Sequence, residues 1–434
     1  MSITVLQKPS DIQPAQSPIV FSVITSGSQA YTASEFQYTA NLYIWSGLPS
    51  QSGSYLYQAR KYPNPSGSGI FDFSKMINST LTRLAAESGN AANNIKYYKV
   101  DFGFQYESGS TYVTQSGALT SVSCSAGGTL FKAYDGYSVF PDAINASLYQ
   151  DTRFTSWPFM TDMTTVTQSV TLTDRTYLGN FTDNERGIPI WTGANDNTYP
   201  SRIAMTASYT DSTRTSASIG LSAITGSITS SHQIFTFATT PGDTFFYGLW
   251  NVSTSKTLDK YVFNAYSGSV LMASANYEVV CVHYYEPIRI AYKNKYGQFD
   301  FFNFYKRHDN QFNTDQRVYQ PQLGTWNSNL LSYNQFQTSQ QRYIVDATEV
   351  LSVNSDWVEE GYNNLFKQMM VSDEIYWVVG PWRSPLTNNP SSTFTEVKPL
   401  TVQTNSLQFK THVNNKLIQY TFTFDIGQPY KLLL

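Results

Sequence analysis

Alternation of apolar and polar residues, the period of a β-strand, runs along much of the chain. It is strict from Phe36 to Ile44, where every even position is apolar, and again from Tyr98 to Tyr106. Such runs predict half-buried antiparallel strands. Between them, glycine- and proline-containing turns recur about every 8 to 12 residues, the spacing of an immunoglobulin or fibronectin type III sandwich. We therefore expect a β-sandwich over residues 1–145, with one inserted helix at about 75–88.

The same character continues over residues 146–285. Apolar residues at Ile203 and Met205 mirror those at Ala217 and Ile219 across a Thr-Asp-Ser turn, which predicts a hairpin with a Ser- and Thr-rich outer face. Further strands are expected at four places: 234–238, 245–252, 261–265 and 277–283. This segment is predicted to be a second β-sandwich.

The pattern changes at Glu286. Ile288, Ile290 and Tyr292 alternate with Arg, Ala and Lys, and a turn ending at Gly297 leads into a run with five aromatics in seven positions, from Phe299 to Tyr305. Period-two alternation around a Gly-containing turn predicts a hairpin. So many aromatics exceed one face of a strand, and we expect the second strand to be covered on both sides, by its own core and by a neighbouring domain or subunit.

The rest of the chain mixes loops, one helix and strands. Residues 308–341 are rich in Asn, Gln and Tyr and predict a loop-rich stretch that becomes ordered by docking. A helix is expected at about 355–371, capped by Asn354 or Ser355 and carrying an apolar stripe. Strands at 375–379 and 418–426 complete a C-terminal α+β domain, residues 286–434. The fold class is thus mainly β: tandem sandwiches followed by an α+β domain.

Composition narrows the class of protein. Charged residues make up 14% and aromatics 15% of the chain, whereas ordinary soluble domains carry roughly 25% charged residues. Interface cores are depleted in charge and enriched in Tyr and Trp. The balance favours a β-rich protein that shares much of its surface with neighbours, and we expect a homo-oligomer.

Several partners and compartments are disfavoured. A net charge of −3 gives no basic stripe for nucleic acid or an acidic membrane. No window is apolar enough to span a membrane, and the first residues do not resemble a signal peptide. The two cysteines, Cys124 and Cys281, are expected to be buried thiols of a protein made in a reducing cytoplasm.

Candidate chemistry is sparse. None of the four histidines has metal-like spacing to another ligand, and no phosphate loop or nucleophile elbow occurs. A glycosidase pair could be drawn from Asp300, Asp309 and Asp315, or from Glu359 and Glu360, and a loose calcium site from Asp309, Asn313 and Asp315, but neither set has a defining spacing. We expect a non-enzymatic protein without cofactor or metal.

Stretches near both ends of the chain carry a family resemblance. ITVLQKPSDIQPAQSPIVFSV, NLYIW and FDFSKMINSTL, with PIRIAYKNKYGQFDFFNFYKR and HVNNKLIQYTFTFDIGQPY later, resemble virion structural proteins of tailed phages of Bacteroidetes hosts, including crAss-like phages and related prophages. The likeness is thin in the middle of the chain. It implies self-assembly in the host cytoplasm and docking to other virion proteins, and it brings no catalytic residues.

Two functional hypotheses follow. The first is a structural component of the tail, baseplate or neck, or a fibre-attachment protein, whose expected interface anchors are Tyr296, Phe299, Phe301, Phe302 and Trp326. The second is a glycan-binding adhesin or receptor-binding protein, which includes a head fibre or a capsid decoration protein. Its candidate glycan contacts are Trp191 and Tyr199, because exposed aromatic rings stack on sugars.

Overall fold

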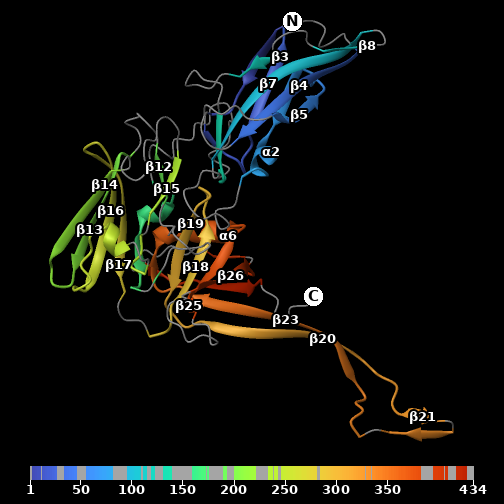
Figure 1. Cartoon of the computed structure of the whole chain (residues 1–434), viewed down its shortest axis with the longest axis vertical. Helices are drawn as coiled ribbons and strands as arrows, with labels where there is room; N and C mark the ends of the chain where they lie inside the picture. The colour runs from blue at the N-terminus through green and yellow to red at the C-terminus, as the bar shows by residue number, and fades with distance from the viewer. Residues whose placement is uncertain are drawn as a thin grey trace. The chain divides into compact units, whose positions relative to one another are not determined.

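The computed structural model shows a mainly β protein with several antiparallel or mixed sheets and few short helices (Figure 1). None of the helices in the described part of the chain is long and apolar enough to cross a membrane. The structure describes residues 2–10, 12–26, 34–45, 55–81, 95–108, 111–114, 119–122, 131–138, 159–172, 174, 189–192, 200–220, 233–237, 239–242, 246–280, 284–327, 329–333, 335–382, 394–404, 406–408 and 417–427.

The chain divides into two compact units. Unit 1 comprises residues 1–281, 292–301 and 364–372, and unit 2 comprises residues 282–291, 302–363 and 373–434. The predicted hairpin after Glu286 is therefore divided, and its turn belongs to unit 1. Cys124, Cys281 and residues 139–158 lie outside the described residues.

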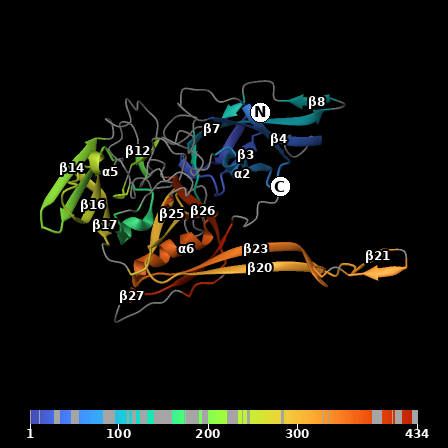
Figure 2. The same cartoon turned by 60° about the horizontal axis from the view of Figure 1, so that its bottom comes forward.

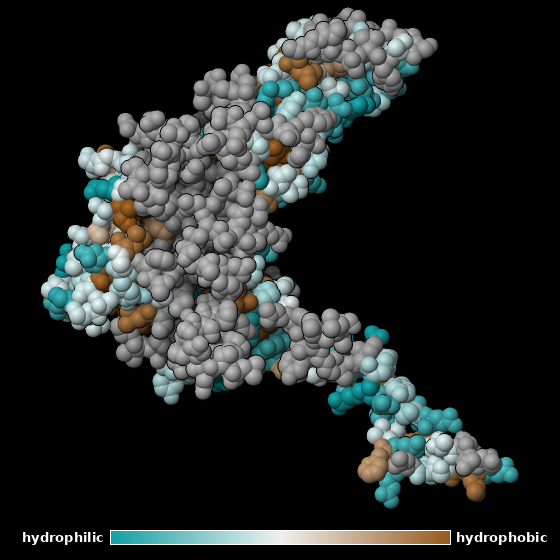
Figure 3. Space-filling model, in the orientation of Figure 1, coloured by the Kyte–Doolittle hydropathy of each residue, from teal (hydrophilic) through white to brown (hydrophobic). Residues whose placement is uncertain are grey.

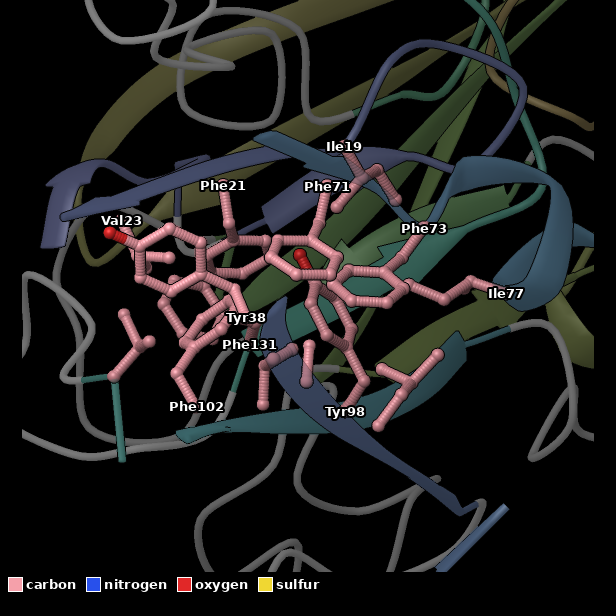
Figure 4. Packing of buried hydrophobic residues seen from close by; sticks show 14 of the residues in the cluster. Ile19, Phe21, Val23, Tyr38, Phe71, Phe73, Ile77, Tyr98, Phe102 and Phe131 are labelled. Carbon is pink, nitrogen blue, oxygen red and sulfur yellow. The ribbon is translucent and has the colours of Figure 1, made fainter. Parts of the chain in front are cut away.

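Two sheets enclose the N-terminal core of unit 1. One has the strand order β1-β3-β6 and the other β2-β10-β7-β4-β5, with β8 and β9 also paired to β7. Phe21 from the first sheet packs on Phe102 and Phe131 from the second, at ring-centroid distances of 5.8 and 5.6 Å (Figure 4). The strands are β1 (Ile3–Gln7), β2 (Ile12–Pro14), β3 (Val20–Thr25), β4 (Ser34–Trp45), β5 (Tyr55–Lys61), β6 (Ser68–Asp72), β7 (Ile95–Ser108), β8 (Thr111–Thr114), β9 (Thr120–Ser121) and β10 (Phe131–Tyr134).

The strictest alternations are confirmed as strands. In β4 every even position from Phe36 to Ile44 is buried. The inserted helix is shorter than predicted: α2 spans Ser74–Asn78, and Asp72 Oδ1 accepts from the Ser74 amide at 2.9 Å. The chain continues from Asn78 as turn and bend, while the rest of the predicted helix from residue 82 lies outside the described residues.

A second hydrophobic core packs against the other sheets of unit 1. The predicted hairpin is confirmed, with Ile203 opposite Ile219 and Met205 opposite Ala217 in a five-stranded sheet of order β11-β17-β16-β13-β14. The strand expected at 245–252 is wrong: α5 (Phe246–Leu249) forms there and buries Phe246 and Trp250. The remaining elements are η3 (Asp162–Thr165), β11 (Thr167–Val170), β12 (Pro189–Thr192), β13 (Arg202–Tyr209), β14 (Arg214–Gly220), β15 (Gln233–Thr236), β16 (Leu258–Ser267) and β17 (Val270–Val279).

A seven-stranded sheet is the main element of unit 2. Its strand order is β19-β18-β25-β26-β28-β23-β20. The ends of β18 and β19 that flank the turn between them belong to unit 1. The bounds are β18 (Ile288–Lys293), β19 (Phe299–Phe304), β20 (Asp309–Tyr319), β21 (Thr325–Asn327), β22 (Leu330–Ser332), β23 (Gln341–Asn354), β24 (Val358–Glu359), η4 (Glu360–Tyr362), α6 (Asn363–Val371), β25 (Ile375–Trp382), β26 (Phe394–Val402), β27 (Leu417–Ile418) and β28 (Thr421–Ile426).

The predicted start of the C-terminal helix is wrong. Asn354 ends β23, and the Ser355 amide donates to the Tyr420 carbonyl at 2.8 Å, so neither residue caps a helix. Val358 pairs with Ile418 in a short ladder, and α6 begins only at Asn363. Long-range pairing thus outweighed a favourable local capping sequence. Pro381, expected in a loop, lies in β25 opposite Thr395 beside a register shift.

The loop-rich stretch predicted at 308–341 is also wrong. β20 and β23 pair antiparallel from Asp309–Ser352 to Tyr319–Gln341, whereas β28 pairs with β23 only from Val350 onward. Residues 312–349 therefore leave the sheet as a two-stranded ribbon, which ends in the small β21–β22 ladder (Figures 1 and 2). We call residues 312–349 the arm. Its strands do not cover a core, so they lack the alternation by which strands are recognised.

Candidate functional site

The turn between β18 and β19 is built by one asparagine. Asn294 is fully buried, and its Oδ1 accepts from the amides of Tyr296 and Gln298 at 2.9 and 3.1 Å. The Gly297 amide donates to the Asn294 carbonyl at 2.9 Å, and Gly297 has a φ of +72°. Asparagine favours such turns because its side chain can bond the backbone two residues on. The turn is therefore specified locally.

Charged side chains then connect this turn to earlier parts of unit 1. Lys293 Nζ lies 2.8 Å from Asp135 Oδ2, and both side chains are 6% exposed. Lys295 Nζ lies 2.7 Å from Asp162 Oδ2. We call the side chains of Asp135, Asp162, Lys293, Lys295, Tyr296 and Gln368 the turn cluster. Because a buried charge left without its partner is costly, these pairs require the three segments to stay together.

Asp162 receives three contacts in the turn cluster. The Tyr296 hydroxyl donates to Asp162 Oδ1 at 2.8 Å, and Gln368 Nε2 of α6 donates to Asp162 Oδ2, also at 2.8 Å. Gln368 Oε1 in turn accepts from the Lys295 amide at 3.1 Å. A carboxylate with donors on both oxygens is well satisfied as an anion. Asp162 therefore has a structural role that fits its position at the start of η3.

The backbone at the turn approaches the 135–137 segment closely. The Tyr137 amide donates to the Lys295 carbonyl at 2.9 Å. A Cβ on Gly297 would stand 1.2 Å from the Asp135 carbonyl oxygen, and one on Gly136 would stand 2.6 Å from the Lys295 carbonyl oxygen. Both glycines are thus required by contact, and Gly297 also by its positive φ.

Asp300, a carboxyl group near the turn cluster, has a raised pKa. Its side chain is 4% exposed, and burial raises its pKa to about 7, against hydrogen bonds from the Thr161 and Asn294 side chains that lower it. Its Oδ2 atom has no hydrogen-bond partner. A group with this pKa could exchange protons near neutral pH, but the small exposed fraction leaves no surface for a substrate. We assign Asp300 no catalytic role.

The expected interface anchors fall into different environments. Tyr296 is 1% and Phe299 9% exposed, so both are buried by the chain's own residues. Phe302 is half-buried and stacks edge-on against Tyr362 and Phe304 within unit 2, and Phe301 is also half-buried. Trp326 lies in β21, opposite Leu331 near the end of the arm. The first two therefore stabilise this chain itself.

Of the residues predicted as glycan contacts or as carboxylate ligands, those that the structure describes lie in several different elements. Trp191 lies in β12 with its backbone opposite Ile234, and Tyr199 lies outside the described residues. Asp309 and Asp315 lie in β20, and Glu359 in β24. Among the described residues, no group of three or more His, Cys, Asp or Glu side chains could hold a metal ion. Asp300 lies in β19, at the opposite edge of the seven-stranded sheet from β20, and Asp309 and Asp315 are about 20 Å apart along β20.

The arm is the surface that the sequence reasoning missed. Every residue of β20 is exposed. No charged residue occurs between Arg317 and Arg342, and large apolar side chains project there into solvent. In Figure 3 the arm, at the lower right, shows apolar atoms scattered among hydrophilic ones. Its exposed apolar residues, with exposed fractions from 39 to 89%, are Phe312, Val318, Tyr319, Leu323, Leu330, Tyr333, Phe336 and Tyr343.

Comparison with known proteins adds little. No family model matches the chain, and no curated protein matches it. The native-conformation structure of E. coli alpha-2-macroglobulin aligns with 81% of this chain at 9% identity and a TM-score of 0.20. The alignment covers 21% of that protein, so the chain spans about a fifth of its length. A score this low carries no evidence of a shared fold or function.

Proposed function

We propose that the protein is a non-enzymatic structural component of a tailed phage virion, in the tail, baseplate, neck or a fibre attachment, and that it acts by self-assembly and docking. The observation that carries this proposal is the arm. An isolated two-stranded ribbon is marginally stable in water, and this one exposes Phe336 at 89% and Leu330 at 76%. When a neighbouring subunit covers exposed apolar groups on a projecting ribbon, the free energy of the assembly falls.

Two further features support the same function. The chain has few charges and many aromatics, the composition of protein interfaces, and its terminal regions resemble virion proteins of Bacteroidetes phages. We also propose a finer fold description: tandem immunoglobulin- or fibronectin-like sandwiches over residues 1–145 and 146–285, followed by an α+β domain. The facing sheets around Phe21 support the first of these sandwiches.

Immunoelectron microscopy tests the proposal directly. Antibody raised against the purified chain should decorate tailed particles produced by the host that carries its gene, at one fixed position on each particle. The proposal fails if purified particles are neither decorated nor contain the chain by mass spectrometry.

A variant with a shortened arm tests whether the arm is needed for assembly. Residues 320–340 are replaced by an Asn-Gly turn, which can join two antiparallel strands directly. We expect unchanged circular dichroism and thermal unfolding, but exclusion from particles. The matched control shortens the exposed β13–β14 turn at Asp211 and Ser212, which should leave incorporation intact. Normal incorporation of the shortened-arm variant would remove the arm from the assembly mechanism.

A further inference from the structure

β20 has a free edge at which another strand could pair. β20 is the last strand of the seven-stranded sheet, and β23 is its only partner strand among the described residues. Its eleven residues, Asp309–Tyr319, are all exposed. An edge strand presents unpaired backbone donors and acceptors, which can extend the sheet by pairing with another strand. Natural edges of this length usually carry charged residues, lysine above all, or proline or a bulge. β20 has no lysine, proline or bulge, and its three charged residues, Asp309, Asp315 and Arg317, are of both signs.

The other edge of the arm is protected. The register of the ribbon shifts between Arg317 and Val318, and the additional residue, Tyr343, lies in β23. A bulge disturbs the edge of the strand that contains it. From Val350 onward β23 is also paired with β28. β20 is thus the regular, open edge of the pair.

Charges along β20 make this edge complementary to itself. Asp315 and Arg317 flank Gln316, and all three side chains are exposed. When two copies of β20 pair antiparallel about a twofold axis through Gln316, Asp315 of each copy faces Arg317 of the other. Opposite charges directly across a ladder stabilise it, and like charges destabilise it. An axis through Asp315 or through Arg317 would instead place like charges opposite each other.

The ribbon also contains an unfavourable charge pair that this arrangement offsets. Asp315 lies directly opposite Asp346 in the β20–β23 ladder, and both residues are exposed. An arginine from a second copy on the free side of Asp315 would neutralise part of this repulsion. The charge pattern therefore favours a second copy of the chain over an unrelated strand.

We propose that β20 pairs antiparallel with β20 of a second copy about a twofold axis at Gln316, so that the sheets of two subunits become continuous through their arms. This inference rests on the proposed assembly function and names its partner. The contact is isologous, the commonest symmetry of soluble oligomers. A single strand-to-strand contact is small compared with stable interfaces, so it should be weak between free chains and strengthened by multiple contacts in a particle.

Charge reversal on the full chain tests the pairing. In sedimentation velocity at low salt, Asp315→Arg and Arg317→Asp should each weaken self-association by about tenfold or more, because each creates two like-charge pairs. An equimolar mixture of the two variants should associate within about threefold of the parent, because every facing pair is then of opposite charge. Arg342→Asp, in the bulged strand of the same arm, is the matched control and should leave association unchanged.

Disulfide trapping tests the register. In a background with Cys124→Ser and Cys281→Ser, Gln316→Cys should give covalent dimers under mild oxidation, because Gln316 would face its own copy on the axis. Thr314→Cys lies two residues away on the same face and should not, since identical residues would then be about 14 Å apart.

The outcomes separate this inference from the proposed function. A parent chain that stays monomeric at high concentration, a mixture without rescue, or equal effects of Arg342→Asp and Arg317→Asp would overturn the pairing of β20. A shortened-arm variant that is excluded from particles, together with charge reversals that change nothing, would leave the assembly function standing and refute this partner alone.

Discussion

Two ribbons that follow each other in the sequence, β18–β19 and the arm, differ in how far their side chains are buried. All six side chains of β18 are buried, including Arg289 and Lys293, while all eleven of β20 are exposed. The β18–β19 ribbon, residues 288–304, has six aromatics and three Ser, Thr, Asn or Gln residues among 17, whereas the arm has six aromatics and 18 such polar residues among 38. Their partners also differ: the turn after β18 inserts among three other segments of unit 1, and the arm leaves its sheet. Aromatic side chains can therefore stabilise the chain itself in one ribbon and remain exposed for an external contact in the other.

The largest effect is expected from a methyl group at the β18–β19 turn. Gly297→Ala would place Cβ 1.2 Å from the Asp135 carbonyl oxygen at a φ of +72°, which requires the backbone to move. We expect a loss of more than about 4 kcal/mol in the free energy of unfolding. Gly268→Ala, at φ +58° with nothing within 4 Å, is the control, and it should cost only about 1 kcal/mol of backbone strain. Similar costs in denaturant titrations would show that the close contact at Gly297 does not matter.

The buried ion pair should come next. Lys293→Met leaves the Asp135 carboxylate buried without its cation, a change that typically costs about 3 to 5 kcal/mol. Adding Asp135→Leu should recover part of the loss, because no uncompensated charge then remains. Arg307→Met breaks the Arg307–Asp309 pair near the base of the arm, where the side chains are 71% and 63% exposed. That change should cost less than about 1 kcal/mol. Equal losses for the two pairs would contradict the contrast between the ribbons.

Asp300 should make stability depend on pH. Its pKa in the folded protein is about 7, above the ordinary carboxyl value of about 3.9. Between these values the folded state keeps a proton that the unfolded state has lost, so stability falls as pH rises through this window and becomes level above it. Asp300→Asn should remove this slope, a relative gain of up to about 4 kcal/mol at pH 8. If the stability of the parent and of Asp300→Asn changed in parallel from pH 4 to 8, Asp300 would not be the source of the pH dependence.

The smallest effect is expected in the arm. Phe336→Ser changes a side chain that is 89% exposed and should alter the free energy of unfolding by less than about 0.5 kcal/mol. Phe304→Ser, at 0% exposed in the same unit, should cost about 3 kcal/mol or more. Thermal melts of the two variants compare them directly. A substantial loss of stability for Phe336→Ser would mean that the arm is tied to the fold of its own chain.

The local sequence pattern predicted the elements that pair within their own sheet. The alternation from Phe36 to Ile44 predicted β4, and the Asn- and Gly-containing turn predicted the β18–β19 hairpin, because a half-buried strand and a tight turn each leave a short-range signature. Aromatic density also predicted that β19 is covered on both sides; Phe299 and Phe304 are buried, whereas Phe301 and Phe302 are half-buried.

Tertiary structure alone decided the rest. Asn354 and Ser355 do not cap a helix but pair with Thr421 of β28 and with Tyr420, because long-range pairing satisfied the same backbone groups. Lys293 and Asp135, which lie far apart in the sequence, form a buried pair that no spacing could reveal. The arm had no signature, since a ribbon without a core needs no alternation. Sequence thus determined which residues favour strands, and long-range contacts determined which strands are buried and which are left for a partner.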